Sequence, residues 1–318
     1  MHVVNTLDLS GAPEGVAALE AIARLESLPP ERDKVLLAIE RADGYLASAV
    51  VRIDEEFLRH APRLRVIGSP STGTDHMDLA AIRRAGITVF DIAKEFGLLR
   101  GFTATSEHAF ALLLMVSRRL VPAVAAAKAG DWARERFRGF QLYQKTFGVI
   151  GLGRLGEIAA RIAQGFGMRV VATDVREVSM VGVQMVDFAT LLRESDVVSL
   201  HVHLTPETRQ LLGRAEFARM QRHAIVINTS RGAVIDETAL LEALKSGTIA
   251  GAGLDVIDGE WLTPDQTKHH PLIAYAREHD NLVITPHVAS ATTESMYGAR
   301  TFMAKKVAEH LRQLTLKA

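Results

Sequence analysis

The feature that most constrains the fold is a glycine-rich turn in the middle of the chain: Gly151-Leu152-Gly153-Arg154-Leu155-Gly156. It follows an apolar run at 147–150 that reads as a β-strand, and it opens a segment with helical periodicity at 154–166. Gly151 permits a tight turn, Gly153 lets the backbone approach a pyrophosphate, and Gly156 allows close packing of the helix on the strand. The turn predicts a dinucleotide site in a doubly wound α/β domain. A turn that only joins two packed elements is the alternative.

The residues that follow the turn indicate which dinucleotide binds. A helix that begins at Arg154 and Leu155 points the N–H groups of its first turn at the phosphates. The next strand ends at Asp174, about 20 residues beyond the glycines, where a carboxylate binds the adenosine ribose and repels a 2′-phosphate. We therefore expect NAD rather than NADP, with Arg176 softening that preference.

From residue 146 onward, apolar runs alternate with segments of helical period. The runs read as short strands at 147–150, 169–173, 197–200, 225–228, 252–255 and 282–285. The segments between them predict helices at 154–166, 214–220 and 236–246. Strands that are apolar on both faces and separated by helices indicate parallel βαβ units. This part of the chain is predicted to be a doubly wound parallel sheet.

The first hundred residues repeat this pattern more weakly, with strands expected at 44–46, 64–67 and 87–90 and a helix near 78–85. A long helical stretch at 106–127 is expected to bridge two domains. The helical segment 292–314 has no strand after it and can cross back to the first domain. We therefore expect two Rossmann-like doubly wound α/β domains, the first of them discontinuous.

Composition excludes several classes of function. The chain has 318 residues, which suits two domains, and its 37 Lys and Arg balance its 37 Asp and Glu, so no basic field favours nucleic acid. The absence of cysteine excludes disulfides and thiolate nucleophiles. We expect no membrane span, no export signal and a cytoplasmic location, because no apolar run is long enough to cross lipid and residues 1–6 lack a signal pattern.

Polar residues follow directly on most of the predicted strands. They are Asp174, His201, the run Asn228-Thr229-Ser230-Arg231-Gly232, Asp255, and the run Thr285-Pro286-His287. Ligands of doubly wound sheets bind outside the carboxyl ends of the strands. We therefore expect these residues to surround one crevice.

Three residues suit hydride transfer to a small 2-oxo acid. Arg231 offers a planar, permanently charged fork for a substrate carboxylate and the neighbouring oxygen. His287 can exchange a proton with the carbonyl oxygen, and Glu260 can hold the imidazole if it bonds the other ring nitrogen. Each has another reading: a surface or capping arginine, a solvated glutamate, and a loop histidine with satisfied hydrogen bonds.

The order of these motifs resembles the D-isomer-specific 2-hydroxyacid dehydrogenase family over nearly the whole chain. The matching runs are Gly151–Gly156, Leu200–Thr208, Ile227–Gly232, Ala250–Val256 and Thr285–His287. The resemblance implies that Arg231, Glu260 and His287 are catalytic and that Asp255 contacts the nicotinamide. It also implies cofactor contacts for His201, Thr205 and Thr229.

The same resemblance implies a flavodoxin-like substrate-binding domain at 1–98 and 289–318 and an NAD-binding Rossmann domain at 99–288. Backbone N–H groups near Thr72 and Gly73 would hold the substrate carboxylate, and the 106–127 helix resembles the family's dimer element. His76 and Asp78 lie in the same loop, but two ligand types without a third partner do not make a metal site. We expect a homodimer without a metal.

Two departures from the family pattern concern the ligands. His203 stands where the family usually has proline, and the segment Trp261–His270 replaces a short Glu-Pro continuation. Trp261 either packs under its loop or shapes the substrate pocket. The identity of the 2-hydroxy acid and the direction of the reaction stay open.

Two other functions share this fold. A phosphite dehydrogenase would keep the same Arg, Glu and His, and a corepressor-like protein would sense NADH and bind peptides without turnover. Oxidation of NADH by 2-oxo acids, phosphite-dependent formation of NADH, and peptide binding separate the three.

Overall fold

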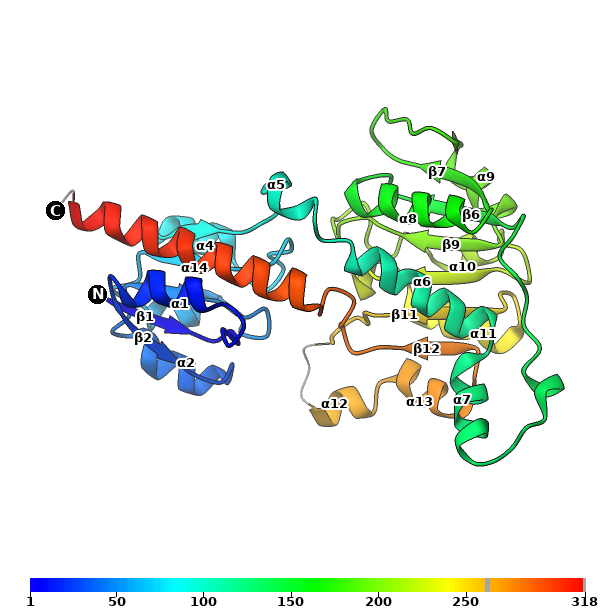
Figure 1. The fold of residues 1–318 in the computed structure, drawn as a ribbon, viewed down its shortest axis with the longest axis horizontal. Helices are drawn as coiled ribbons and strands as arrows, with labels where there is room; N and C mark the ends of the chain where they lie inside the picture. The colour runs from blue at the N-terminus through cyan, green and yellow to red at the C-terminus, as the bar shows by residue number, and fades with distance from the viewer. Residues whose placement is uncertain (261–263, 317–318) are drawn as a thin grey trace. The chain divides into compact units, whose positions relative to one another are not determined.

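The computed structural model describes residues 1–260 and 264–316, and the chain divides into two units (Figure 1). One comprises Met1–Phe102 with Ala291–Ala318, and the other comprises Thr103–Ser290. Each is built on a fully parallel sheet with helices connecting its strands. The predicted fold class, two doubly wound α/β domains with the first one discontinuous, is confirmed.

The second unit contains a seven-stranded sheet in the order β12-β11-β10-β9-β6-β7-β8. The strands are β6 (Thr146–Ile150), β7 (Arg169–Thr173), β8 (Val183–Met185), β9 (Val197–Leu200), β10 (Ile225–Asn228), β11 (Gly251–Leu254) and β12 (Leu282–Ile284). The strand order reverses between β6 and β9, the point where such sheets bind dinucleotides. Because all strands are parallel, their carboxyl ends share one edge, as the sequence predicted. The edge strand β8 was missed because Gln184 interrupts its short apolar run.

Buried apolar clusters lie against this sheet, and helices cover it. They are α6 (Ala104–Ser117), α7 (Leu120–Lys128), α8 (Arg154–Gly165), α9 (Phe188–Glu194), α10 (Arg214–Phe217), α11 (Glu237–Ser246), α12 (Pro264–Lys268) and α13 (Pro271–Glu278), with short 3₁₀ turns η1 (Arg134–Phe137) and η2 (Gly232–Val234). Helix α6 buries Leu112 and Leu113 and contacts β10, β11 and β12.

The prediction of one bridging helix over 106–127 is wrong in two respects. The stretch is broken at Arg119, whose φ of 51° is left-handed and cannot continue an α-helix, so α6 and α7 are separate. Both helices belong to the second unit, and the chain passes between units at 102–103 and 290–291. Within the described residues no single helix is long and apolar enough to cross a membrane, and one bent pair, Phe96–Ser117 with Leu120–Lys128, meets the length and composition criteria.

The first unit contains a five-stranded sheet in the order β2-β1-β3-β4-β5, the order of flavodoxin-like domains. Its strands are β1 (His2–Asn5), β2 (Arg24–Ser27), β3 (Gly44–Leu46), β4 (Val66–Gly68) and β5 (Thr88–Phe90). Its helices are α1 (Pro13–Glu20), α2 (Arg32–Ile39), α3 (Glu55–Arg59), α4 (Leu79–Arg84), α5 (Phe96–Leu99) and α14 (Thr293–Leu316). The edge strand β2 escaped prediction because charged residues interrupt its apolar pattern.

Helix α14 completes the first unit from the far end of the sequence. It packs against α1 and against β3 and β4, and Figure 1 shows the red α14 beside the blue α1. Gly15 permits this approach, because an added Cβ would lie 2.9 Å from the Cβ of Ala304. The segment after β12 therefore returns to the first unit, as the sequence predicted.

Candidate active site

The glycine turn after β6 has the geometry that a bound pyrophosphate needs. Gly151 has a φ of +93°, and an added Cβ there would lie 2.7 Å from the carbonyl oxygen of His201. An added Cβ on Gly156 would lie 2.1 Å from the carbonyl oxygen of Gly151. At Gly153 an added Cβ would meet only the guanidinium of Arg176, at 3.7 Å, so that backbone is open to a ligand. No side chain of the described residues caps the N-terminus of α8, which suits an anion. These residues fit a dinucleotide.

Asp174 lies immediately after β7 and beside this turn, as predicted. Its Oδ2 accepts a hydrogen bond from the backbone N–H of Leu152 at 2.8 Å. Its Oδ1 accepts from the backbone N–H and the Nε of Arg176 at 2.9 and 3.0 Å. The Arg176 side chain is the main reason that the pKa of Asp174 is lowered. The carboxylate is therefore ionised and directed to the turn, with Arg176 lying across it.

Three other predicted cofactor residues lie after β9 and β10. The Nε2 of His201 lies 2.9 Å from the Oγ of Ser199, and burial lowers the pKa of His201 to about 4, so the ring is neutral. Thr205 is exposed, and its backbone N–H donates to the Oγ1 of Thr208 at 2.8 Å. The hydroxyl of Thr229 is buried without a hydrogen-bond partner among the described residues. Thr229 thus presents a polar atom that a ligand could satisfy.

Asp255 follows β11 and organises the backbone after β12. Its carboxylate accepts hydrogen bonds from the backbone N–H groups of Val288 and Ala289 at 2.9 and 2.8 Å and from the hydroxyl of Thr285 at 2.5 Å. Burial by itself would raise the pKa of Asp255, but these donors together with His108 outweigh it and lower the pKa. An ionised, 1 % exposed carboxylate therefore holds the turn on which His287 sits.

His108 is a member of this network that the sequence interpretation missed. From α6, its Nε2 lies 2.9 Å from the Oγ1 of Thr285 and 3.4 Å from the Oδ1 of Asp255. Because the Thr285 hydroxyl donates to Asp255, its oxygen accepts from His108, which assigns the proton to Nε2. The one available signal was a histidine near the start of a predicted apolar helix.

His287 and Glu260 are in direct contact. The Nδ1 of His287 lies 2.7 Å from the Oε1 of Glu260, the hydrogen bond that the sequence predicted. Glu260 follows β11 and His287 follows the adjacent β12, and their side chains are 15 % and 28 % exposed. His287 has a left-handed φ of 52°, an uncommon conformation for a residue with a side chain. A carboxylate accepts hydrogen bonds, so the contact with Glu260 places the ring proton on Nδ1 and directs Nε2 away from Glu260.

Arg231 follows β10, and β10 pairs with β11, the strand that precedes Glu260. Its Nη1 donates to the carbonyl oxygen of Ser230 at 2.8 Å, and its own carbonyl accepts from the side-chain amide of Asn228 at 2.9 Å. The turn packs on the backbone that leads to Glu260, because an added Cβ on Gly232 would lie 2.1 Å from the carbonyl carbon of Ile257. The three predicted catalytic residues therefore follow the neighbouring strands β10, β11 and β12.

The predicted substrate loop lies in the first unit. Thr72 is exposed there, and the backbone N–H of Gly73 donates to the Oγ of Ser71 at 3.3 Å. Asp78 caps α4 by accepting from the backbone N–H of Ala81 at 2.8 Å. Among the described residues there is no group of three or more potential metal ligands. Trp261 lies outside the described residues.

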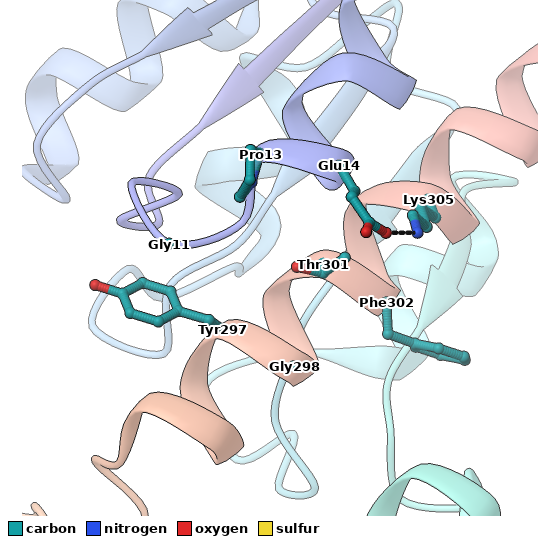
Figure 2. A pocket seen from close by; sticks show the side chains of 8 residues that line it. All are labelled: Gly11, Pro13, Glu14, Tyr297, Gly298, Thr301, Phe302 and Lys305. Atoms are coloured by element: carbon teal, nitrogen blue, oxygen red, sulfur yellow. Dashed lines mark hydrogen bonds and ion pairs between the residues drawn. The ribbon is translucent and has the colours of Figure 1, made fainter.

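A surface hollow of about 440 Å³ also lies in the first unit, between α1 and α14 (Figure 2). Its lining consists of Gly11, Pro13, Glu14, Tyr297, Gly298, Thr301, Phe302 and Lys305. Glu14 and Lys305 form an ion pair at its side, and the ring of Tyr297 lies against Gly11. The hollow contains none of the predicted site residues.

Comparison with known proteins agrees with these observations. The family model described as the NAD-binding domain of D-isomer-specific 2-hydroxyacid dehydrogenases matches residues 110–289, and the catalytic-domain model of the same family matches residues 5–95. A glyoxylate reductase of Thermococcus litoralis is 39% identical over 293 residues, which cover 87% of this chain and 83% of that protein.

Among the solved structures that match nearly the whole chain, two illustrate the similarity. The TT0316 protein from Thermus thermophilus has a TM-score of 0.86 at 38% identity, covering 98% of this chain and 97% of that one. D-lactate dehydrogenase from Aquifex aeolicus, solved with NAD and lactic acid, has a TM-score of 0.82 at 28% identity, covering 100% and 97%. The chain therefore belongs to the D-isomer-specific 2-hydroxyacid dehydrogenase family, and it is an NAD-dependent oxidoreductase of that family.

Proposed function

We propose that the enzyme interconverts a small 2-oxo acid and the D-2-hydroxy acid, with His287 as general acid and base, Glu260 orienting His287, and Arg231 binding the substrate. The observation that carries this proposal is the 2.7 Å contact between the Nδ1 of His287 and the Oε1 of Glu260. It lies at the carboxyl edge of the sheet that also holds the glycine turn. Proton exchange and cofactor binding are thus supported within one unit.

In the direction of reduction, bound NADH would provide the hydride for the carbonyl carbon. Arg231 binds the carboxylate through its planar guanidinium and polarises the adjacent carbonyl oxygen. His287 then gives the proton on Nε2 to that oxygen, and the imidazolium charge is stabilised by Glu260 until the proton leaves. Oxidation runs through the same groups in reverse, with His287 as the base.

For the cofactor, we propose that Gly151, Gly153 and Gly156 with the N–H groups of Arg154 and Leu155 cradle the pyrophosphate. Asp174 binds the adenosine ribose and favours NAD over NADP. The hydroxyl of Thr229, which has no hydrogen-bond partner among the described residues, completes the contacts together with His201, Thr205 and Asp255. The open backbone at Gly153 and the uncapped start of α8 support this assignment.

For the domains, we propose that residues 1–98 with 289–318 bind substrate and that 99–288 bind NAD. The division of the chain at 102–103 and 290–291 falls within a few residues of these boundaries. Backbone N–H groups at Thr72 and Gly73 would hold the substrate carboxylate. Since the N–H of Gly73 donates to Ser71 in this structure, substrate has to replace that bond.

The test is a panel of 2-oxo acids with NADH: glyoxylate, hydroxypyruvate, pyruvate, and bulkier branched and aromatic acids. We expect turnover on the smaller acids, because a glyoxylate reductase is 39% identical to this chain. Loss of NADH absorbance reports turnover, and chiral analysis of the product reports the D configuration. Failure of every acid, together with NADH formation from phosphite or with peptide capture, would reject the proposal.

We further propose that the enzyme is a homodimer through α7. This helix consists largely of alanine, valine and leucine, yet none of its residues is buried by the part of the chain that the structure describes. Val121 and Val124 are 50 % and 53 % exposed. Apolar faces of this kind usually meet a partner. Light scattering should report a dimer that Val124→Asp weakens, whereas Val181→Asp, at another exposed valine, should not.

A further inference from the structure

Glu237, the first residue of α11, contacts the chain on both sides of Glu260. Its Oε1 accepts a hydrogen bond from the backbone N–H of Asp258 at 2.7 Å. Its Oε2 lies 3.1 Å from the Nε2 of His270, which immediately precedes α13. Asp258 comes two residues before Glu260, and His270 comes ten residues after it. One carboxyl group therefore contacts the chain on both sides of Glu260.

The Glu237 carboxyl group is largely buried, so its ionised form is destabilised. The side chains of Glu237 and His270 are only 18 % and 12 % exposed. Burial, followed by repulsion from Asp258, Glu260 and Asp236, raises the pKa of Glu237 to about 7, although the Asp258 N–H opposes the change. Burial also lowers the pKa of His270. At neutral pH the pair is therefore a polar contact rather than a fully ionised bridge, and it adds little stability.

Helix capping does not account for Glu237. Asp236 already caps α11 by accepting from the backbone N–H of Ala239 at 3.1 Å. An acidic residue in the first turn stabilises a helix from an exposed position just as well. Glu237 points inward instead, where its carboxyl group contacts the backbone N–H of Asp258 and the ring of His270.

We propose that Glu237, with His270 as its second anchor, is a positioning residue that keeps Glu260 aligned with the Nδ1 of His287. The inference rests on the roles proposed above for Glu260 and His287. It follows from the geometry: the backbone two residues before Glu260 is held by the Glu237 carboxyl and by the close packing of Gly232 on Ile257 and Asp258. Removing the carboxyl group takes away the hydrogen bond to the Asp258 N–H and the contact with His270, and it leaves the packing on Gly232 in place.

The test compares Glu237→Ala and Glu237→Gln with Glu242→Ala, a control on the same helix that loses a surface ion pair with Arg214. Glu237→Ala should lower kcat roughly 10–100-fold while the KM for NADH changes less than about twofold, because small misplacements of catalytic groups cost up to about 100-fold. Glu237→Gln should retain kcat within about threefold, because its amide can make both contacts. Glu242→Ala should match the wild type.

A double-mutant cycle shows whether Glu237 acts through Glu260. In a Glu260→Ala background, Glu237→Ala should cause little further loss of kcat. Equal loss in both backgrounds would overturn the inference, as would a Gln variant as impaired as the Ala variant. Urea unfolding identifies a variant that fails to fold. If Glu237→Ala does so, His270→Gln replaces it in the comparison and should lower kcat more than Glu242→Ala does.

His287→Ala separates the two proposals. If it stays active, the proposed general acid is wrong. If His287→Ala and Glu260→Ala both lower kcat while Glu237→Ala behaves like Glu242→Ala, only the positioning role fails.

Discussion

Replacing Asp255 tests whether a buried carboxylate holds the turn that carries His287. The side chain accepts from the backbone N–H groups of Val288 and Ala289 and from the hydroxyl of Thr285. In Asp255→Ala, Val288 can turn to water because it is 38 % exposed, whereas Ala289 is 4 % exposed and its N–H is left unpaired. A stranded donor costs about 1–3 kcal/mol, and each bond to a charged acceptor contributes about 1.5–3 kcal/mol.

Counting one stranded donor and one lost charged bond, we expect Asp255→Ala to lower the free energy of unfolding by about 2.5–6 kcal/mol. Asp255→Asn should cost about 1–3 kcal/mol, because its oxygen still accepts while its NH₂ opposes the Ala289 N–H. Urea denaturation at pH 7 measures both values. We also expect kcat to fall in both variants, since the turn fixes the backbone of His287.

The pH dependence supplies a second check. The pKa of Asp255 is lowered in the folded state, so its contribution is present above the unfolded pKa of about 3.9 and is lost as the pH falls through the folded value. The stability difference between wild type and Asp255→Asn should therefore shrink below about pH 4. A cost of Asp255→Ala under about 0.5 kcal/mol at pH 7, or a difference that persists in acid, would refute the reasoning.

Four further predictions follow from single contacts. His287→Ala should lower kcat by roughly 10²–10⁴ with NADH binding kept by fluorescence titration, and near-wild-type turnover would reject the general acid. Asp174→Ala should reduce the preference for NAD over NADP about 10–100-fold in kcat/KM, and an unchanged ratio would assign the ribose contact elsewhere. Gly156→Ala should weaken NADH binding and lower stability by about 1–3 kcal/mol in urea, because its Cβ would overlap the carbonyl of Gly151; wild-type behaviour would contradict the packing. Because the pKa of Glu237 is raised to about 7 in the folded state, the wild-type free energy of unfolding falls as the pH rises from about 4.5 to about 7. Between pH 5 and pH 8 the free energy of unfolding of Glu237→Gln should therefore rise by about 2–3 kcal/mol relative to that of the wild type. Parallel pH curves for the two proteins would argue against a raised pKa.

The sequence by itself predicted the parts of the fold that depend on local pattern. Strands such as 225–228 are apolar on both faces because helices cover the sheet on both sides, so they stand out without any alignment. The glycine turn is equally visible in the sequence, because its three glycines lie within six residues, between a predicted strand and a predicted helix. The fold class and the shared edge of polar residues followed from these two patterns.

Elements with weak local signals could not be predicted. The short edge strands β2 and β8 lack an unbroken apolar run, and pairing with a neighbour makes them strands. The break between α6 and α7 depends on one left-handed residue, Arg119, which a helical pattern does not reveal.

Contacts between distant residues were decided by the tertiary structure. The sequence predicted a hydrogen bond between Glu260 and His287. The two residues are 27 positions apart, however, and only the pairing of β11 with β12 brings them within 2.7 Å. His108 reaches Thr285 across 177 positions, and Glu237 binds Asp258 across 21, and neither contact has a local signature. Periodicity and turn chemistry are local and determined the scaffold and the cofactor turn. The supports of Asp255, Glu260 and His287 are nonlocal, because they form only when adjacent parallel strands bring their carboxyl ends together.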